Sequence, residues 1–598
     1  MRDSNHGRGD APVQPGISLD RRALLRGAAG LTAGIAGARL LGASGVLASP
    51  TGVGPGLLRA RMSLPAGAAP EDKQILIVPS DPTTTSVMDF YENVYKRPSY
   101  AADLFSDPLV RVDKNFKIVP AAATEWAVGA DGVTWTFKLD PKLVWSDGAA
   151  VTANDWVATF QYAADPKHAW DFTWFWQGVI KGWDSAITGK VPLTDVGVRQ
   201  GADAQTLIIE TQAPAPYLPA MLLYSLPLSA AALLKHGPLY NNKPETAVSS
   251  GPFILNEWIQ DQHIVYTRNA SYRGTLDVAI QKVIVKLADF STHFTMYQSD
   301  EIDLMEGLTP AQQKIATDLF PKDVHSSVGD FRTFYVYFDV TKKPFDDPKV
   351  RQAWSHAIDR DVIASKVLGP MGSPAYSWLA PGFPGSDREG FKGIQAFEPA
   401  KAKQLLTEAG YPDGDGFPKQ QMWLRAPTPL DKAVSGAFAA MIKQNLNIDV
   451  ELLEKDQTGY MAALTAKPTE ILLGYVSYGM DFLDPTNMLG VWLSGGRHSW
   501  SNPTFDAKVK EASSFLGSTE ERLKLFHEAE QTLVEDVPAV FVYHETPLQL
   551  VKPWLQGDAI EPDATGNTSI HWPRYTSMST VPGGLHVADT VPGDHGKL

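Results

Sequence analysis

Residues 120–165 have the sequence PAAATEWAVGADGVTWTFKLDPKLVWSDGAAVTANDWVATFQYAAD, in the order strand, turn and helix. Apolar and polar side chains alternate from Val133 to Leu139, with the two-residue period of a half-buried strand. Thr152 and Asp155 have the spacing of a capping box, with Asp in place of the usual Glu or Gln. We expect a helix after this box, with a buried face that includes Trp156, Phe160 and Ala163. Taken alone, these features predict scaffold and no chemistry.

The composition is that of an ordinary soluble globular protein. Of the 598 residues, 44% are hydrophobic and 20% are charged, and the length gives room for about two to four domains. The 16 Trp, 19 Tyr and 25 Phe indicate large apolar or stacking surfaces, although core packing alone could use most of them. The net charge of −14 argues against a nucleic-acid partner. The absence of cysteine excludes disulfides, Cys-ligated zinc, iron–sulfur clusters, thiol catalysis and a lipoprotein-type anchor.

The N-terminal segment has the parts of an export signal. Arg21 and Arg22 precede a Gly/Ala-rich apolar run over 27–38, which is shorter than the ~20 residues that a membrane span needs. Small residues follow, and a cut after Ala48 would give a signal over residues 1–48. The paired arginines are similar to those of a Tat signal, which implies export in the folded state. A disordered basic leader is the alternative, and residues 49–73 are predicted to be a linker.

Four further segments follow along the chain. They are SSGPFIL (249–255), EID (301–303), KPFDDPKVRQAWSHAIDR (343–360) and FEPAKAKQLLTEAGYPDGDGFP (397–418). Together with residues 120–165 they resemble, in the same order, the signature segments of the extracellular solute-binding proteins, family 5. That family comprises the dipeptide and oligopeptide receptors of ABC transporters. The resemblance extends over roughly residues 75–560.

The block at 343–360 also predicts a helix on physical grounds. Asp347 is placed to cap it and Pro348 suits its first turn. Its apolar face is expected to contain Val350, Ala353, Trp354, Ala357 and Ile358. His356 falls on the opposite side, and we expect it to be a surface residue and not a ligand.

The resemblance implies an α/β fold with two lobes, the class II or Venus-flytrap form of periplasmic binding proteins, with an additional subdomain on the N-terminal lobe. Lobe I is predicted to combine residues 74–115, 248–340 and 546–598. The subdomain is predicted over 116–247 and lobe II over 341–545.

The resemblance also implies a function. Such a protein is the exported, periplasmic or cell-surface receptor of an ABC importer, binds a solute by hinge closure and then docks on the permease subunits in the membrane. We expect an oligopeptide ligand, no cofactor or metal, no nucleic acid and a monomeric state. Oligosaccharides, opine-like compounds and nickel complexes are alternative ligands in the family.

Seven residues are candidates for the ligand site. By resemblance, Asp481 falls where the family pairs an acidic residue with the peptide's α-amine, although a turn or helix-cap role is an equal alternative. Arg425 lies near where some members place an arginine that binds a carboxylate. The other candidates are the aromatic walls Trp378, Tyr475 and Tyr478, the predicted crossing point at Gly251, and Ser106, which replaces a family Glu.

A secreted hydrolase is the alternative from a different class. The chain has no Gly-x-Ser-x-Gly, His-Glu-x-x-His or phosphate-binding glycine loop. Sugar hydrolysis by a pair of carboxylates remains an alternative, because the 67 acidic residues allow many pairs. Asp413 and Asp415 suggest a calcium loop only superficially, since the rest of that motif is missing. We therefore expect that the protein is not an enzyme.

Overall fold

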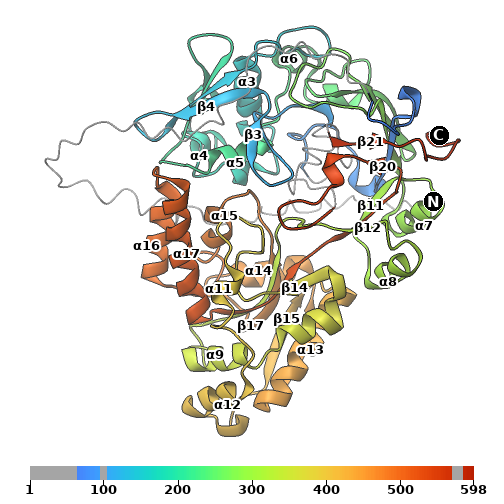
Figure 1. Ribbon diagram of the computed structural model, residues 1–598. Helices are drawn as coiled ribbons and strands as arrows, with labels where there is room; N and C mark the ends of the chain where they lie inside the picture. The colour runs from blue at the N-terminus through green and yellow to red at the C-terminus, as the bar shows by residue number, and fades with distance from the viewer. Residues whose placement is uncertain (1–63, 95–103, 569–583, 598) are drawn as a thin grey trace, which may run out of the picture.

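The computed structural model describes residues 64–94, 104–568 and 584–597 (Figure 1). The predicted export signal and most of the predicted linker lie outside these residues. Figure 1 shows two parts, one above the other, each with its own sheets. We call them lobe I, which contains the described residues up to 326 and from 548 onward, and lobe II, which contains residues 333–545.

The main sheet of lobe I has four strands. In order they are β1 (Ile75–Ser80), β10 (Lys282–Leu287), β9 (His263–Arg268) and β8 (Phe253–Ile259), with only β1 and β10 parallel. Every residue of β1 is buried, because Leu76 and Val78 face one apolar cluster while Ile75 and Ile77 face another. A strand covered on both faces has a continuous apolar sequence, and residues 75–78 show this.

Smaller elements complete this part of lobe I. A three-stranded sheet contains β11 (Leu304–Glu306), β19 (Leu548–Val551) and β12 (Val324–Ser326), next to helices α7 (His293–Gln298) and α8 (Pro310–Leu319). Two short pairs are β2 (Val110–Val112) with β3 (Ile118–Pro120), and β20 (Leu555–Gln556) with β21 (His586–Val587).

The opening sequence stretch forms the subdomain of lobe I. Its antiparallel sheet has the order β4 (Ala123–Val128), β5 (Thr134–Leu139), β7 (Thr206–Glu210) and β6 (Val198–Gln200). Its helices are α3 (Ala153–Ala164), α4 (Trp183–Ala186), α5 (Leu218–Met221) and α6 (Ala230–His236). Buried and half-buried residues alternate along β5, and the Asp155 carboxylate accepts a hydrogen bond from the Thr152 N–H at 2.8 Å. The predicted strand, capping box and helix are confirmed.

Lobe II is built on a six-stranded mixed sheet. Its order is β14 (Gly372–Pro374), β18 (Ala539–Glu545), β13 (Thr333–Phe338), β17 (Leu473–Tyr478), β15 (Gln420–Arg425) and β16 (Val450–Lys455). One face packs on α9 (Pro348–His356), α12 (Pro399–Glu408) and α13 (Pro429–Leu446). The other packs on α14 (Gln457–Thr465), α15 (Pro485–Gly490), α16 (Pro503–Ser514) and α17 (Thr519–Asp536). The short helices α10 (Arg360–Ile363) and α11 (Arg388–Phe391) lie in the connections.

Within the described residues, the chain passes between the lobes twice, over residues 327–332 from β12 to β13 and over 546–547 from β18 to β19. The two crossings are adjacent, since the Ser327 N–H donates to the Pro547 carbonyl at 2.8 Å. β13 lies inside the range predicted for lobe I, yet it pairs with β17 and β18 in the lobe II sheet. Two short adjacent connections are the geometry that allows hinge motion.

Helix α9 confirms one expectation and corrects another. The Asp347 carboxylate caps it by accepting from the Lys349 N–H at 2.8 Å, and its predicted apolar face is buried. The expectation that His356 is a surface residue is wrong. Its ring is buried against the Ala396 carbonyl, at 2.7 Å from Nδ1, and burial lowers its pKa. The segment ending at residue 396 covers this side of the helix, and helix periodicity alone does not reveal such a covering.

Candidate ligand-binding site

The loop 479–484 lies where lobe II meets the subdomain. It follows β17 and ends at Asp484, which caps α15 by accepting from the Thr486 N–H at 2.9 Å. The Phe482 ring stacks on Tyr217 of the subdomain, with centroids 5.6 Å apart, and meets Phe175 edge-on at 6.1 Å. This loop therefore places its residues at the junction of the two lobes.

Asp481 is buried at this junction, with 2% of its surface exposed. Its Oδ2 accepts hydrogen bonds from the Tyr478 hydroxyl at 2.7 Å and from Asn487 Nδ2 at 3.2 Å, and its N–H donates to Asn487 Oδ1 at 2.7 Å. The helix-cap role belongs to Asp484, whose carboxylate also pairs with both terminal nitrogens of Arg522 at 2.7 Å. The hydrogen bonds from Tyr478 and Asn487 thus fix the orientation of the Asp481 carboxylate at the junction.

Trp378 supports Tyr478 from the interior of lobe II. The two rings are nearly parallel with centroids 6.2 Å apart, and Trp378 is fully buried. Its Nε1 donates to the Met488 carbonyl at 2.7 Å, and its ring also contacts Tyr335 and Trp492. In this structure Trp378 positions the tyrosine next to Asp481 and presents no surface of its own.

Tyr475 lies on the opposite face of the lobe II sheet from Tyr478. Residues separated by an odd number along a strand point to opposite faces, and the two tyrosines are three apart on β17. Tyr475 packs in the cluster under α13, and its hydroxyl donates to Asp431 at 3.1 Å. The structure therefore does not bring Tyr475 together with Asp481 and Tyr478 as walls of one pocket.

Arg425 lies at the end of β15, close to Tyr478's strand. Its Nη2 donates to the Ser477 hydroxyl oxygen at 3.1 Å, and Arg332 Nη1 donates to the same oxygen at 3.0 Å. Burial lowers the pKa of Arg425 to about 10, and the charges of Arg497 and Arg332 add to this effect. The structure thus brings Arg425 and Arg332 together at Ser477, the residue before Tyr478 on β17.

Arg497 also lies beside Tyr478 and was not predicted from the sequence. It lies in the connection between α15 and α16, and its guanidinium carbon is 5.5 Å from the centre of the Tyr478 ring. The only available sequence signal was its position shortly after the acidic segment 481–484, which is weak.

Gly251 and Ser106 lie at the junction between the subdomain and the rest of lobe I. The Gly251 N–H donates to the Phe105 carbonyl at 3.1 Å, and a Cβ at residue 251 would lie 2.6 Å from the Leu104 carbonyl oxygen. Ser106 Oγ donates to the Pro227 carbonyl at 3.4 Å. The close approach of the backbone at Gly251 to the backbone at residues 104–105 accounts for a glycine at this position.

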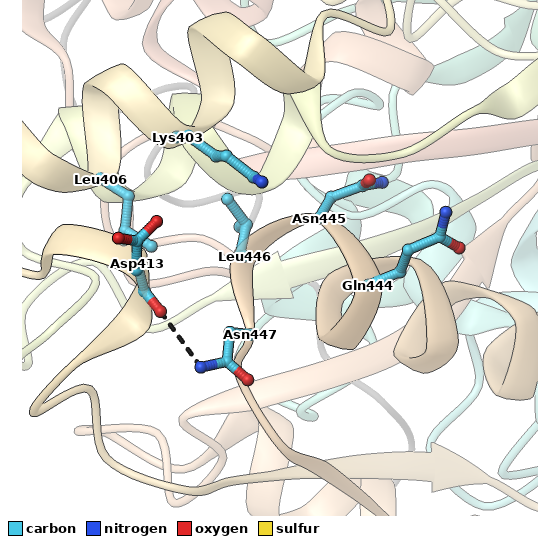
Figure 2. A pocket seen from close by; sticks show the side chains of 7 residues that line it. All are labelled: Lys403, Leu406, Asp413, Gln444, Asn445, Leu446 and Asn447. Atoms are coloured by element: carbon cyan, nitrogen blue, oxygen red, sulfur yellow. Dashed lines mark hydrogen bonds between the residues drawn. The ribbon is translucent and has the colours of Figure 1, made fainter.

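A small polar pocket lies elsewhere, at the far end of lobe II. Figure 2 shows it between α12 and the C-terminal end of α13, with Lys403 above and Asp413 and Asn447 below. Asn447 Nδ2 donates to the Asp413 carbonyl at 3.2 Å, which ties the loop after α12 to the end of α13. In Figure 1 these helices lie at the opposite end of lobe II from α15. This pocket is therefore not part of the Asp481 site.

The residues that the structure describes contain no group of three or more His, Asp or Glu side chains able to hold a metal ion. Over the same residues, no helix combines the length and apolar composition needed to cross a bilayer.

The architecture is that of a two-lobed solute-binding protein. It has two lobes of sheets and helices, two adjacent crossings between them and a buried carboxylate at their junction.

Residues 117–500 match the family profile described as "Bacterial extracellular solute-binding proteins, family 5 Middle". The chain belongs to this family, which is made of solute-binding proteins and not of enzymes. It is 30% identical to the periplasmic oligopeptide-binding protein OppA of Escherichia coli strain K12, over 87% of this chain and 95% of that protein. It is 29% identical to the probable deoxycholate-binding periplasmic protein YgiS of the same strain, over 80% and 89%.

Solved structures show the same two-lobed periplasmic-binding-protein fold. The unliganded open form of the periplasmic murein tripeptide binding protein MppA superposes with a TM-score of 0.73 at 26% identity, covering 88% of this chain and 99% of that one. The Haemophilus influenzae OppA complex with the peptide RPPGFSPFR has a TM-score of 0.61 at 24% identity and covers 87% of this chain and 99% of that one. This likeness supports the fold alone.

Proposed function

We propose that this protein is the receptor of an ABC importer and binds oligopeptides between its two lobes. The observation that carries the proposal is Asp481, a carboxylate buried at the lobe junction and oriented by Tyr478 and Asn487. In this proposal it pairs with the peptide's α-ammonium group, and Tyr478 and Arg425 border the bound peptide. The oligopeptide-binding relatives support the same ligand class.

The two crossings at 327–332 and 546–547 support closure of the lobes about this pair of connections. A peptide that touches both lobes binds the closed form more tightly than the open form, and its binding free energy therefore shifts the population toward closure. The closed protein, acting as a monomer, then docks on the permease subunits.

We take the lobe limits to be the crossings at 327–332 and 546–547. This moves the predicted boundary at 340 to the segment before β13.

The proposal is tested by isothermal titration calorimetry with mixtures of di- to pentapeptides. We expect saturable heat with free peptides and at least a tenfold loss of affinity when the same peptides are N-acetylated, because acetylation removes the ammonium charge. The matched control is the C-amidated peptide, which keeps the ammonium group. An absence of heat from every free peptide would contradict the proposal.

We further propose that residues 1–48 direct export by the twin-arginine route, on the basis of the Arg21-Arg22 pair ahead of an apolar run. Changing both arginines to lysine is expected to keep the precursor in the cytoplasm and remove most of the exported protein. Cell fractionation and immunoblotting measure this. Undiminished export of the Lys-Lys variant would contradict this route.

A further inference from the structure

Two guanidinium groups lie beside the proposed peptide site without a carboxylate partner. Among the residues that the structure describes, Arg425 donates only to the Ser477 hydroxyl at 3.1 Å and, weakly, to the Met461 sulfur at 3.9 Å. Arg497 has 8% of its surface exposed, and its Nε and Nη2 atoms are buried without any hydrogen-bond partner. Within the described ranges, no Asp or Glu lies at ion-pair distance from either arginine.

Three other buried arginines have acceptors for their guanidinium groups, either a carboxylate or backbone carbonyls. Arg522 pairs with both carboxylate oxygens of Asp484 at 2.7 Å. Arg360 donates to the carbonyls of Phe541 and Gln395, at 2.6 and 2.7 Å, among other acceptors. Arg351 pairs with Asp536 at 2.6 Å. Leaving a buried charged donor unpaired is unfavourable, so Arg497 would gain from an acceptor that the ligand supplies.

The neighbouring cation Arg332 does not share this property. It pairs with Asp330 and, at 3.3 Å, with Glu545, and it meets Arg425 only through the Ser477 hydroxyl. Of the three arginines, Arg425 and Arg497 are therefore the two without a carboxylate partner among the described residues. The charges of Arg497 and Arg425 both oppose the rise that burial gives to the pKa of Tyr335.

Tyr478 connects the two charged sites. Its hydroxyl donates to Asp481, while the guanidinium of Arg497 lies over its ring. A ligand with its ammonium group at Asp481 would therefore lie beside the tyrosine whose ring Arg497 covers, and Arg425 is bonded to Ser477, the next residue on the same strand. One α-carboxylate offers a single bidentate pairing and would neutralise only one of the two guanidinium charges. Full compensation needs two carboxylates.

We propose that Arg425 and Arg497 together bind the two carboxylates of an acidic C-terminal residue, so that this receptor prefers di- and tripeptides ending in Asp or Glu. The inference rests on the proposed function and adds to it a second anionic contact at Arg497. The planar fork of each arginine takes one carboxylate in bidentate fashion, and Tyr478 sets the spacing between the ammonium and carboxylate ends.

The test is calorimetry with the pairs Ala-Glu and Ala-Gln, and Ala-Ala-Glu and Ala-Ala-Gln, which differ only in one carboxylate. We expect the wild type to bind the Glu peptides of at least one pair about 10- to 100-fold more tightly than the Gln peptides. In Arg497→Gln this ratio is expected to fall to about twofold or less. Arg273→Gln, an exposed arginine of lobe I, removes the same charge at a distant place and should keep the wild-type ratio.

The outcomes separate this inference from the proposed function. Equal binding of the Glu and Gln peptides by the wild type would contradict the acidic preference and leave peptide binding intact. A preference that persists in Arg497→Gln would exclude Arg497 as its source. No heat from any free peptide would contradict the proposed function and, with it, this inference. The wild-type comparison needs no variant, and it holds even if Arg497→Gln does not fold.

Discussion

Replacing Asp481 by asparagine is expected to weaken peptide binding by roughly 30-fold or more, which corresponds to about 2 kcal/mol or more for losing one partner of a buried charge pair. The amide keeps the size of the carboxylate, and its oxygen can still accept from the Tyr478 hydroxyl and Asn487 Nδ2. The substitution therefore keeps both of these hydrogen bonds while it removes the charge. Calorimetry with a free peptide measures the effect.

The control for this variant is the N-acetylated form of the same peptide. The wild type and Asp481→Asn should bind it with similar, low affinity, because the ammonium group that distinguishes them is missing. A double-mutant cycle over the two proteins and two peptides then isolates the ammonium–carboxylate term. If Asp481→Asn bound the free peptide as tightly as the wild type, Asp481 would not be the amine site.

The second large effect concerns Glu530, whose carboxylate supports Trp378 from α17. Its side chain is fully buried, and Oε1 accepts from the N–H groups of Trp378 and Leu379 at 2.8 Å each. Burial raises the pKa of Glu530 to about 8, although these two hydrogen bonds oppose the shift. The folded protein therefore favours the protonated form of this carboxyl group near neutral pH.

The free energy of unfolding should therefore decrease as the pH rises. In the unfolded chain a glutamate has a pKa of about 4.3. Between that value and about 8 the folded state binds more protons than the unfolded state at this site. The contribution of Glu530 to the free energy of unfolding is therefore largest below about pH 4.3 and is lost as the pH rises to about 8. The contribution is on the order of a few kcal/mol.

Urea unfolding of the wild type and Glu530→Gln at pH 5, 6.5 and 8 measures this contribution. We expect the free energy of unfolding of Glu530→Gln to decrease less with pH than that of the wild type. Glu520→Gln, an exposed site on the same helix, should follow the wild type. Parallel pH profiles for the wild type and Glu530→Gln would show that Glu530 is not a buried carboxyl of raised pKa.

Local features of the fold could be predicted from sequence because they depend on neighbouring residues. The alternation from Val133 to Leu139 and the caps at Thr152 and Asp347 all involve residues within a few positions of one another. The opposite orientation of Tyr475 and Tyr478 could also have been predicted, since an odd spacing on a strand decides it.

Other features depend on contacts between distant segments. The burial of His356 results from the segment at 396, and the position of Arg497 over Tyr478 results from the path of the connection after α15. Neither has a local pattern. The placement of Asp481 at the junction was predicted only through the family resemblance, and the structure adds the contacts of Phe482 with the subdomain.

The lobes of this receptor are expected to close on a peptide held by its ammonium group. Because the chain has no cysteine, the exposed Lys190 of the subdomain and Glu511 of lobe II can both be changed to cysteine and spin-labelled specifically. We expect the distance between the labels, measured by pulsed electron resonance, to shorten on adding a free peptide and to stay the same with its N-acetylated form. An unchanged distance in a protein saturated with free peptide would contradict the account.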